Sequence, residues 1–115
     1  MHNVIEFIHS NIGRELSLSM LARIAGVSPH HFSRLFKDST GLSPHQYVLR
    51  QRIERAQQYL QNMELTIGEI SGLTGFATPE HFSKVFRRFV GVTATEFRSF
   101  PKSKSNTTGG KKCIE

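Results

Sequence analysis

The chain has 115 residues, a formal net charge of +6 and a sequence pI near 10.0, which together favour a polyanionic partner such as nucleic acid. No apolar run approaches the roughly 20 residues of a membrane-spanning helix, and the first residues do not resemble a signal peptide. The single cysteine, Cys113, cannot form an internal disulfide, so nothing indicates an oxidising compartment. We therefore expect one small cytoplasmic domain.

Helical periodicity runs through residues 1–100, so an all-α fold is expected. A first short helix ends at Gly13 and places apolar residues on one face, namely Val4, Ile5, Ile8 and Ile12. A second helix stops at Gly26 and has a similar apolar face, formed by Leu18, Leu21, Ala22 and Ile24. Both patterns are typical of helices that pack one face against a core.

The third predicted helix begins at Ser28 and Pro29. The serine hydroxyl suits the N-cap, and proline suits the first helical position, where no N–H is needed. This helix ends near Gly41 and is expected to point three apolar side chains inward, those of Phe32, Leu35 and Phe36.

The longest predicted helix begins at Pro44, after a capping box formed by Ser43 and Gln46. One apolar stripe continues along this segment and is formed by Leu49, Ile53, Ala56 and Leu60. We therefore expect a single helix over residues 44–62. Its length would be about 28 Å.

The sequence then repeats itself. Residues 16–26 match residues 65–75 at an offset of 49, and residues 28–47 match residues 78–97 at an offset of 50. Six pairs in the second stretch are identical: Pro29/Pro79, His31/His81, Phe32/Phe82, Ser33/Ser83, Phe36/Phe86 and Gly41/Gly91. This predicts two units of the same structure, at about 16–42 and 65–92, joined by the helix over 44–62.

Each repeated unit has the layout of a helix-turn-helix, whose second helix can lie in a DNA major groove. The outward faces of the two second helices carry His30, Ser33, Arg34 and Lys37, then Glu80, Ser83, Lys84 and Arg87. Arginine can pair with guanine, and Lys37 and Arg87 are better placed for phosphates. Glu80 would accept from a cytosine amino group or repel phosphate. A helix of about 28 Å suits two major grooves about 34 Å apart.

Other classes of function have less support in the residues. No Gly-x-Ser-x-Gly elbow or phosphate loop is present, so we predict no enzyme activity and no cofactor. His30 and His31 point about 100° apart on one helix and cannot chelate together, so no metal site is predicted. A protein-interaction module and a non-specific basic DNA binder, both on the same scaffold, remain as alternatives.

Over roughly residues 3–99, the sequence resembles the AraC/XylS-type DNA-binding domain of bacterial transcription regulators. The residues that carry the resemblance lie, in the first unit, at Leu18, Leu21, Ala22, 26–29, 32–37, 41–44 and Tyr47. In the joining helix they are Arg52, Ile53, Ala56 and Leu60, and in the second unit they lie at Ile67, Ile70, 75–76, 82–87, 91–93 and 97–98. The sequence departs from the family pattern at three places: Ala94 stands where proline is usual, Gly68 and Gly72 lie inside a helix, and Glu80 is acidic. Thr93 and Glu96 can still form a capping box around Ala94.

The resemblance implies about seven helices, two helix-turn-helix units and sequence-specific binding to double-stranded promoter DNA. It implies that six residues face the bases: His30, Ser33, Arg34, Glu80, Ser83 and Lys84. Seven others are expected to face phosphates: Ser28, His31, Lys37, Thr78, His81, Arg87 and Arg88. The expected location is the cytoplasm, in association with the nucleoid, and RNA polymerase is an expected partner.

Family members often carry a separate effector or dimerisation domain before this one. The chain is either a small stand-alone regulator or a domain of a longer protein, and we prefer the second interpretation. Residues 101–115 are poor in apolar residues and are expected to form a basic disordered tail. Half of the net charge lies there, so the placement of charge on the two second helices matters more than the total.

Overall fold

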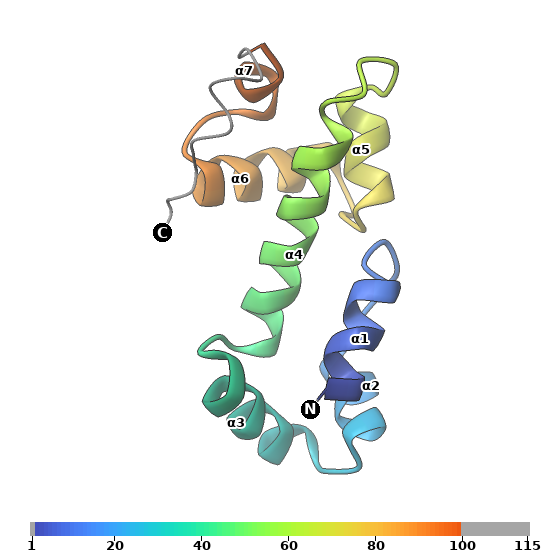
Figure 1. The fold of residues 1–115 in the computed structure, drawn as a ribbon, viewed down its shortest axis with the longest axis vertical. Helices are drawn as coiled ribbons and strands as arrows, with labels where there is room; N and C mark the ends of the chain where they lie inside the picture. Colours follow the sequence, from blue (N-terminus) through green and yellow to red (C-terminus); the bar gives the residue numbers. More distant parts are fainter. Residues whose placement is uncertain (1, 100–115) are drawn as a thin grey trace.

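The computed structural model describes residues 2–99, which form seven helices and no strand (Figure 1). The helices, in chain order, are α1 (His2–Ser10), α2 (Leu18–Ala25), α3 (Pro29–Thr40), α4 (Pro44–Tyr59), α5 (Ile67–Leu73), α6 (Pro79–Val90) and α7 (Ala94–Ser99). The prediction of an all-α fold with about seven helices is confirmed. The predicted tail over 101–115, which includes Cys113, lies outside the described residues.

The repeat seen in the sequence has a counterpart at both ends of α3 and α6. The hydroxyl of Ser28 accepts a hydrogen bond from the His31 N–H at 3.2 Å, and that of Thr78 accepts one from the His81 N–H at 3.1 Å. Each helix is 12 residues long and ends at a glycine in the left-handed region, where residues with a Cβ are strained. N-caps and C-terminal glycines at equivalent positions therefore give α3 and α6 the same start, end and length.

Two separate hydrophobic clusters lie on either side of the middle of α4. The first is formed by Val4, Ile8, Ile12, Leu21, Ala22, Phe32, Phe36 and Val48. The second is formed by Leu49, Ile53, Ala56, Leu60, Ile70, Phe76, Phe82, Val85, Phe86 and Ala94. Val48 and Leu49 are adjacent in the chain and point about 100° apart, so α4 contributes to both clusters. It is the last helix of the first unit and the first helix of the second.

The helix predicted over 44–62 is three residues shorter, because α4 ends at Tyr59 with Leu60 as its C-cap. Its 16 residues span about 24 Å. Just beyond the helix end, Arg98 of α7 donates hydrogen bonds to the carbonyls of Leu60 and Asn62, both at 3.1 Å. The Asn62 carbonyl also accepts from the Leu65 N–H at 3.1 Å, so the turn after α4 is held by backbone bonds and by Arg98 together.

Three side chains predicted to face inward lie largely at the surface: Leu18 is 41% exposed, Ile24 40% and Leu35 38%. The repeat partner of Leu35, Val85, is only 5% exposed. The difference arises because α6 packs directly against α4, whereas α3 packs mainly against α2. The two units therefore share a backbone plan but not an identical core.

The departure from the family pattern at Ala94 leaves the start of α7 intact. Thr93 Oγ1 accepts from the Glu96 N–H at 3.1 Å, and the Glu96 carboxylate accepts from the Thr93 N–H at 3.0 Å. This capping box was predicted, and it orders the helix start without proline. Ala94 itself is buried.

The arrangement of the helices places α3 and α6 at opposite ends of α4 and on the same side of it (Figure 1). Helices α1, α2 and α5 lie on the other side in the same view. The described part of the molecule is elongated, with extents of 44 × 26 × 21 Å. Among residues 2–99, no helix is long and apolar enough to cross a membrane.

Candidate nucleic-acid interface

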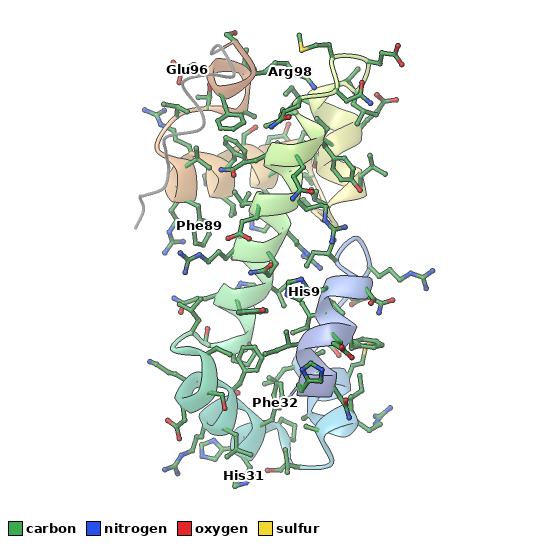
Figure 2. All side chains as sticks on the ribbon, viewed as in Figure 1. His9, His31, Phe32, Phe89, Glu96 and Arg98 are labelled. Carbon is green, nitrogen blue, oxygen red and sulfur yellow. The ribbon has the colours of Figure 1, made fainter. Side chains whose placement is uncertain are left out.

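The surface of α3 that was predicted to face DNA is mostly open to solvent. His30, Arg34 and Lys37 are exposed, and Ser33 is half-buried. On the opposite face, Phe32 points into the first unit while the neighbouring His31 points away from it (Figure 2). Because polar and apolar residues alternate with the helical period, burial of the phenylalanines presents the basic face outward.

The equivalent face of α6 is also open. Glu80, Ser83, Lys84 and Arg87 are exposed, whereas the three residues of the inner face are buried, namely Phe82, Val85 and Phe86. The four polar residues border a shallow groove of about 430 Å³, which Thr93 at the start of α7 completes. The two second helices thus display polar faces at matching positions.

The four cations on these faces are free of carboxylate partners within the described residues. Two ion pairs occur there, His2–Glu6 at 3.1 Å and Arg50–Glu54 at 4.0 Å, and neither involves α3 or α6. No carboxylate oxygen of residues 2–99 lies within 4.0 Å of Arg34, Lys37, Lys84 or Arg87. Their charge is therefore available to an anionic partner.

Glu80 has a structural role that is independent of any partner. It lies in the first turn of α6, where the positive end of the helix dipole stabilises a carboxylate. Glu80 and Lys84 are four positions apart on α6, but among the ion pairs of residues 2–99 there is none between them. Its side chain is exposed on the polar face, so it would meet any molecule that contacts α6.

The residues predicted to face phosphates fall into three groups. Lys37, Arg87 and Arg88 are exposed in the last turns of their helices. The hydroxyls of Ser28 and Thr78 are engaged as N-caps, but each keeps a hydrogen that it can donate outward. The two histidines that follow the caps are both exposed, His31 and His81.

The two histidines differ in what surrounds them. The His81 ring lies edge-on to the Phe76 ring, with centroids 5.4 Å apart. Phe76 is buried in the second cluster, so this contact ties the start of α6 to the turn that follows α5. His81 therefore has a packing role in addition to its predicted contact with phosphate.

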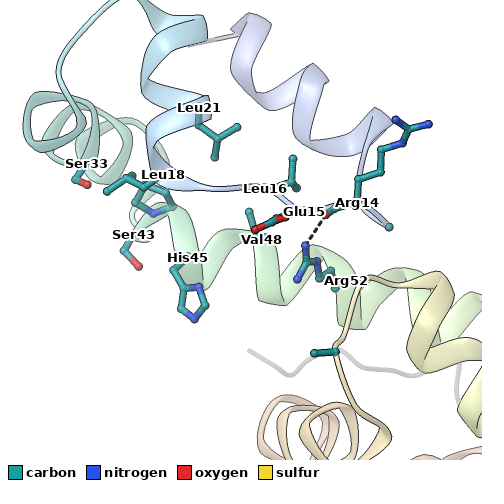
Figure 3. Close-up of a pocket in the computed structure, with 14 residues that line it drawn as sticks. Arg14, Glu15, Leu16, Leu18, Leu21, Ser33, Ser43, His45, Val48 and Arg52 are labelled. Carbon is teal, nitrogen blue, oxygen red and sulfur yellow. Dashed lines mark hydrogen bonds between the residues drawn. The ribbon is translucent and has the colours of Figure 1, made fainter.

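Between the two units lies a second groove, of about 570 Å³, shown in Figure 3. Most of its lining comes from the first unit and the start of α4, including Ser33, Ser43 and His45, and the second unit contributes Gly75 and Ala77. This groove was not predicted, because it is lined by residues distant in the sequence. It shows that Ser33 lies at the border of α3 with the inter-unit space.

Arg52 of α4 is a further residue to which the sequence assigned no role. Its Nε donates to the Ile12 carbonyl at 3.1 Å, and its Nη2 donates to the Arg14 carbonyl at 2.8 Å. Burial lowers the pKa of this guanidinium from its ordinary value. The available signal was an arginine beside the apolar stripe of Leu49 and Ile53, where a charge is retained only if it is hydrogen-bonded.

Within residues 2–99, no three side chains of the metal-ligating types come together. The site features described are thus exposed basic and hydroxyl groups on two repeated helices, and two grooves beside them. These features define the class of the protein as a tandem helix-turn-helix domain.

Comparison with known proteins agrees with this class. A family model described as a helix-turn-helix domain matches residues 21–99. A crystal structure of a transcriptional regulator with an AraC-type DNA-binding domain, from Chromobacterium violaceum, is 31% identical, covers 91% of each chain and superposes with a TM-score of 0.78. The chain belongs to the family of AraC-type helix-turn-helix domains.

Two further proteins similar to this chain are a domain crystallised with DNA and a longer regulator. The DNA-binding domain of the global transcriptional factor AdpA, crystallised with a target DNA, is 25% identical, covers 93% of this chain and 96% of that one, and gives a TM-score of 0.85. The probable transcriptional regulator LumQ of Photobacterium leiognathi is 32% identical over 94 residues. That match covers 82% of this chain and 38% of LumQ.

Proposed function

We propose that the chain binds double-stranded DNA in a sequence-specific manner, with α3 and α6 in adjacent major grooves, and thereby regulates transcription. The observation that carries this proposal is the matching pair of exposed polar faces on α3 and α6, both on the same side of α4. Two helix faces that only meet solvent have no reason to carry matching residues. Two faces that contact a partner with a repeated surface do. Successive major grooves of DNA provide that repeat.

The dimensions of the molecule suit this arrangement. Successive major grooves on one side of B-DNA are about 34 Å apart. The longest extent of the described residues is 44 Å; α3 lies near one end of it, and α6 lies beyond the middle toward the other end, with α7 and the turn before α5 farther out (Figure 1). One chain is therefore long enough to reach both grooves without a second copy.

The residues divide by chemistry into base-facing and phosphate-facing groups. Arg34 is suited to the O6 and N7 acceptors of guanine, and Ser33, Ser83 and Lys84 to polar base edges. Glu80 is suited to a cytosine amino group, and His30 completes the base-facing set. Contacts to phosphates, which position the protein without reading sequence, are assigned to Ser28, His31, Lys37, Thr78, His81, Arg87 and Arg88.

The relatives support a regulatory role for the whole protein. The AdpA domain is crystallised with a target DNA, and LumQ is a probable transcriptional regulator. The chain spans 38% of the length of LumQ, so an additional effector or dimerisation domain and contact with RNA polymerase are part of the proposal. We further propose that the protein is not an enzyme and acts in the bacterial cytoplasm, on the nucleoid.

Selection of bound duplexes from a random pool tests this function. We expect two unlike sequence elements about one helical turn apart. The selected duplex should then bind more tightly than a scrambled one at every salt concentration. A double variant, Arg34→Ala with Lys84→Ala, should lose that difference, while Arg23→Ala, an exposed cation in the last turn of α2, should keep it.

The two alternatives give different results in the same experiment. Equal binding to all sequences, with a steep dependence on salt, would identify a non-specific basic binder. Absence of binding at low salt would exclude DNA as the partner and leave a protein-interaction module.

A further inference from the structure

The relative placement of α3 and α6 depends on what joins the two hydrophobic clusters. Helix α4 is common to both, but its side chains enter the first cluster at Val48 and the second from Leu49 onward. A rigid shared helix fixes the separation of the units along its axis. Because each unit packs on its own face of α4, the helix also sets their mean rotation about that axis, and contacts elsewhere limit how far each unit departs from it.

Several of those contacts meet at the guanidinium of Arg52, while a second arginine of α4, Arg55, donates to the His9 carbonyl of α1 at 3.3 Å. Arg52 extends from α4 and donates to the Ile12 and Arg14 carbonyls, which belong to the turn after α1 in the first unit; Figure 3 shows the bond to Arg14. Its guanidinium carbon also lies 6.0 Å from the centroid of the Phe76 ring, which belongs to the second unit. One side chain thus touches α4, the first unit and the second unit.

The backbones of the two units meet at the same place. A Cβ built on Gly75 would lie 2.9 Å from the Ile12 carbonyl oxygen and 3.0 Å from the Arg52 guanidinium. A Cβ built on Gly13 would lie 2.5 Å from the Leu73 carbonyl oxygen. Two glycines therefore allow the turn after α1 and the turn after α5 to approach each other, and Arg52, hydrogen-bonded to the first turn, lies against the second.

This junction is connected directly to the start of α6. Gly75 and Phe76 lie in the turn between α5 and α6, and Phe76 contacts both His81 and Phe82 of α6 through ring pairs with centroids 5.4 Å apart. A change in the position of this turn relative to α1 is therefore a change in the position of α6 relative to the first unit.

We propose that Arg52 is a positioning residue, which holds the two units in one relative orientation and so sets the spacing between the two DNA elements that the protein accepts. The proposal rests on the function proposed above. Insertion of one base pair between the elements moves one by about 3.4 Å and rotates it by about 34° relative to the other. A protein whose units are held rigidly rejects such a site, and a protein whose units rotate freely tolerates it.

The first test measures orientation without DNA. Spin labels are placed at Ser39→Cys of α3 and Phe89→Cys of α6, two exposed positions at equivalent places in the repeat, in a chain that also carries Cys113→Ser. The distribution of distances between the two labels should be narrow in the protein that keeps Arg52. It should be broad in Arg52→Met, because methionine keeps an apolar side chain but has no hydrogen-bond donor. Arg50→Met, an exposed cation on the same helix, should leave it narrow.

The second test compares selected duplexes with the same duplexes lengthened by one base pair between the elements. The preference of the wild-type chain for the selected spacing should fall at least about tenfold in Arg52→Met, because two charge-assisted hydrogen bonds are lost and one alone accounts for a factor of about that size. Binding to a duplex with one element should be unchanged, as should the spacing preference of Arg50→Met. Arg52→Lys keeps the charge but lacks the planar guanidinium that donates to two carbonyls. Its spacing preference should lie between those of the wild type and Arg52→Met.

The outcomes distinguish the positioning role from general destabilisation. An unchanged distance distribution in Arg52→Met, or an equal loss of affinity at both spacings, would overturn the proposal. If Arg52→Met does not fold, Arg52→Lys serves for both measurements with the same criteria. If the wild-type chain selects no sequence, the proposed function fails and the spacing inference fails with it, whereas the distance measurement still decides whether Arg52 holds the units together.

Discussion

Two glycines at the end of α5 should respond in opposite directions to the same substitution by alanine. Gly72 lies inside the helix with no positive φ, and a Cβ added to it meets nothing within 4 Å. Gly75 lies three residues later at φ +86°, against the Ile12 carbonyl. Gly72→Ala should therefore stabilise the fold, and Gly75→Ala should destabilise it.

The magnitudes follow from separate terms. Alanine in place of glycine inside a helix gains about 1 kcal/mol, because the unfolded chain loses freedom and the helix propensity rises. At position 75 the left-handed backbone costs about 1–2 kcal/mol for a residue with a Cβ. The overlap with the Ile12 carbonyl adds about 1–3 kcal/mol, since backbone gives way less easily than a side-chain end. The two variants should differ by about 3–6 kcal/mol.

Urea and thermal unfolding of the two variants beside the wild type measure this difference. In a domain of this size, 1 kcal/mol corresponds to a change in Tm of about 4–8 °C, so the two variants should lie clearly on either side of the wild type. If Gly75→Ala is as stable as the wild type, the close approach of the two turns described above is wrong. If Gly72→Ala is less stable than the wild type, the description of Gly72 as a position with free space for a Cβ is wrong.

The remaining predictions concern the interface, the second core and the pH dependence. Arg34→Ala should weaken binding by about 1–3 kcal/mol and relax the preference at one base pair in gel-shift titrations, whereas an equal loss for all sequences would make Arg34 a phosphate contact. Phe82→Ala should lower the free energy of unfolding by about 3–5 kcal/mol, because Phe82 is fully buried; urea titration measures it beside Phe89→Ala, an exposed control, and similar losses for both would contradict the face assignment. Burial, with a smaller effect of Glu54, raises the pKa of Tyr47 above 10.0, so the phenol contributes stability below that pH and loses the contribution as pH rises through the folded pKa. The fall in stability above about pH 10 should be smaller in Tyr47→Phe, and an identical fall in both chains would show that Tyr47 does not contribute to it.

Local signals in the sequence predicted the ends of the repeated helices well. The start of α3 at Ser28 and Pro29, its end at Gly41 and the capping box of Thr93 and Glu96 depend on neighbouring residues alone, and the structure has all of them. The capping box expected at Ser43 and Gln46 is only half present in the described residues. Ser43 accepts from the Gln46 N–H, without a bond in return.

Features that depend on distant residues could not be predicted in the same way. Leu35 has the correct helical spacing for a buried residue, yet its burial depends on which helix covers α3, and the sequence of α3 does not contain that information. The turn after α4 is held in part by Arg98, 38 residues beyond Leu60. The junction at Arg52 joins positions 12, 14, 52 and 75, and no local pattern connects them.

The exposed polar faces of α3 and α6 were only partly predictable from the sequence. Helical period separates Phe82 and Phe86 from Ser83 and Lys84, so the sequence predicts which side chains are outward. It does not predict that Ser33 lies half-buried at the edge of the inter-unit groove while Ser83 is exposed. The roles of individual residues toward bases and phosphates remain predictions.

The shared helix α4 limits how a protein of this kind can change during evolution. A flexible linker tolerates insertions, because the parts that it joins are not aligned by it. A single residue inserted after Val48 would instead turn everything beyond it by about 100° and shift it by about 1.5 Å. The apolar residues of the second unit would then no longer face their partners. Length changes are therefore expected in the surface turns of such proteins, while α4 keeps a constant number of residues.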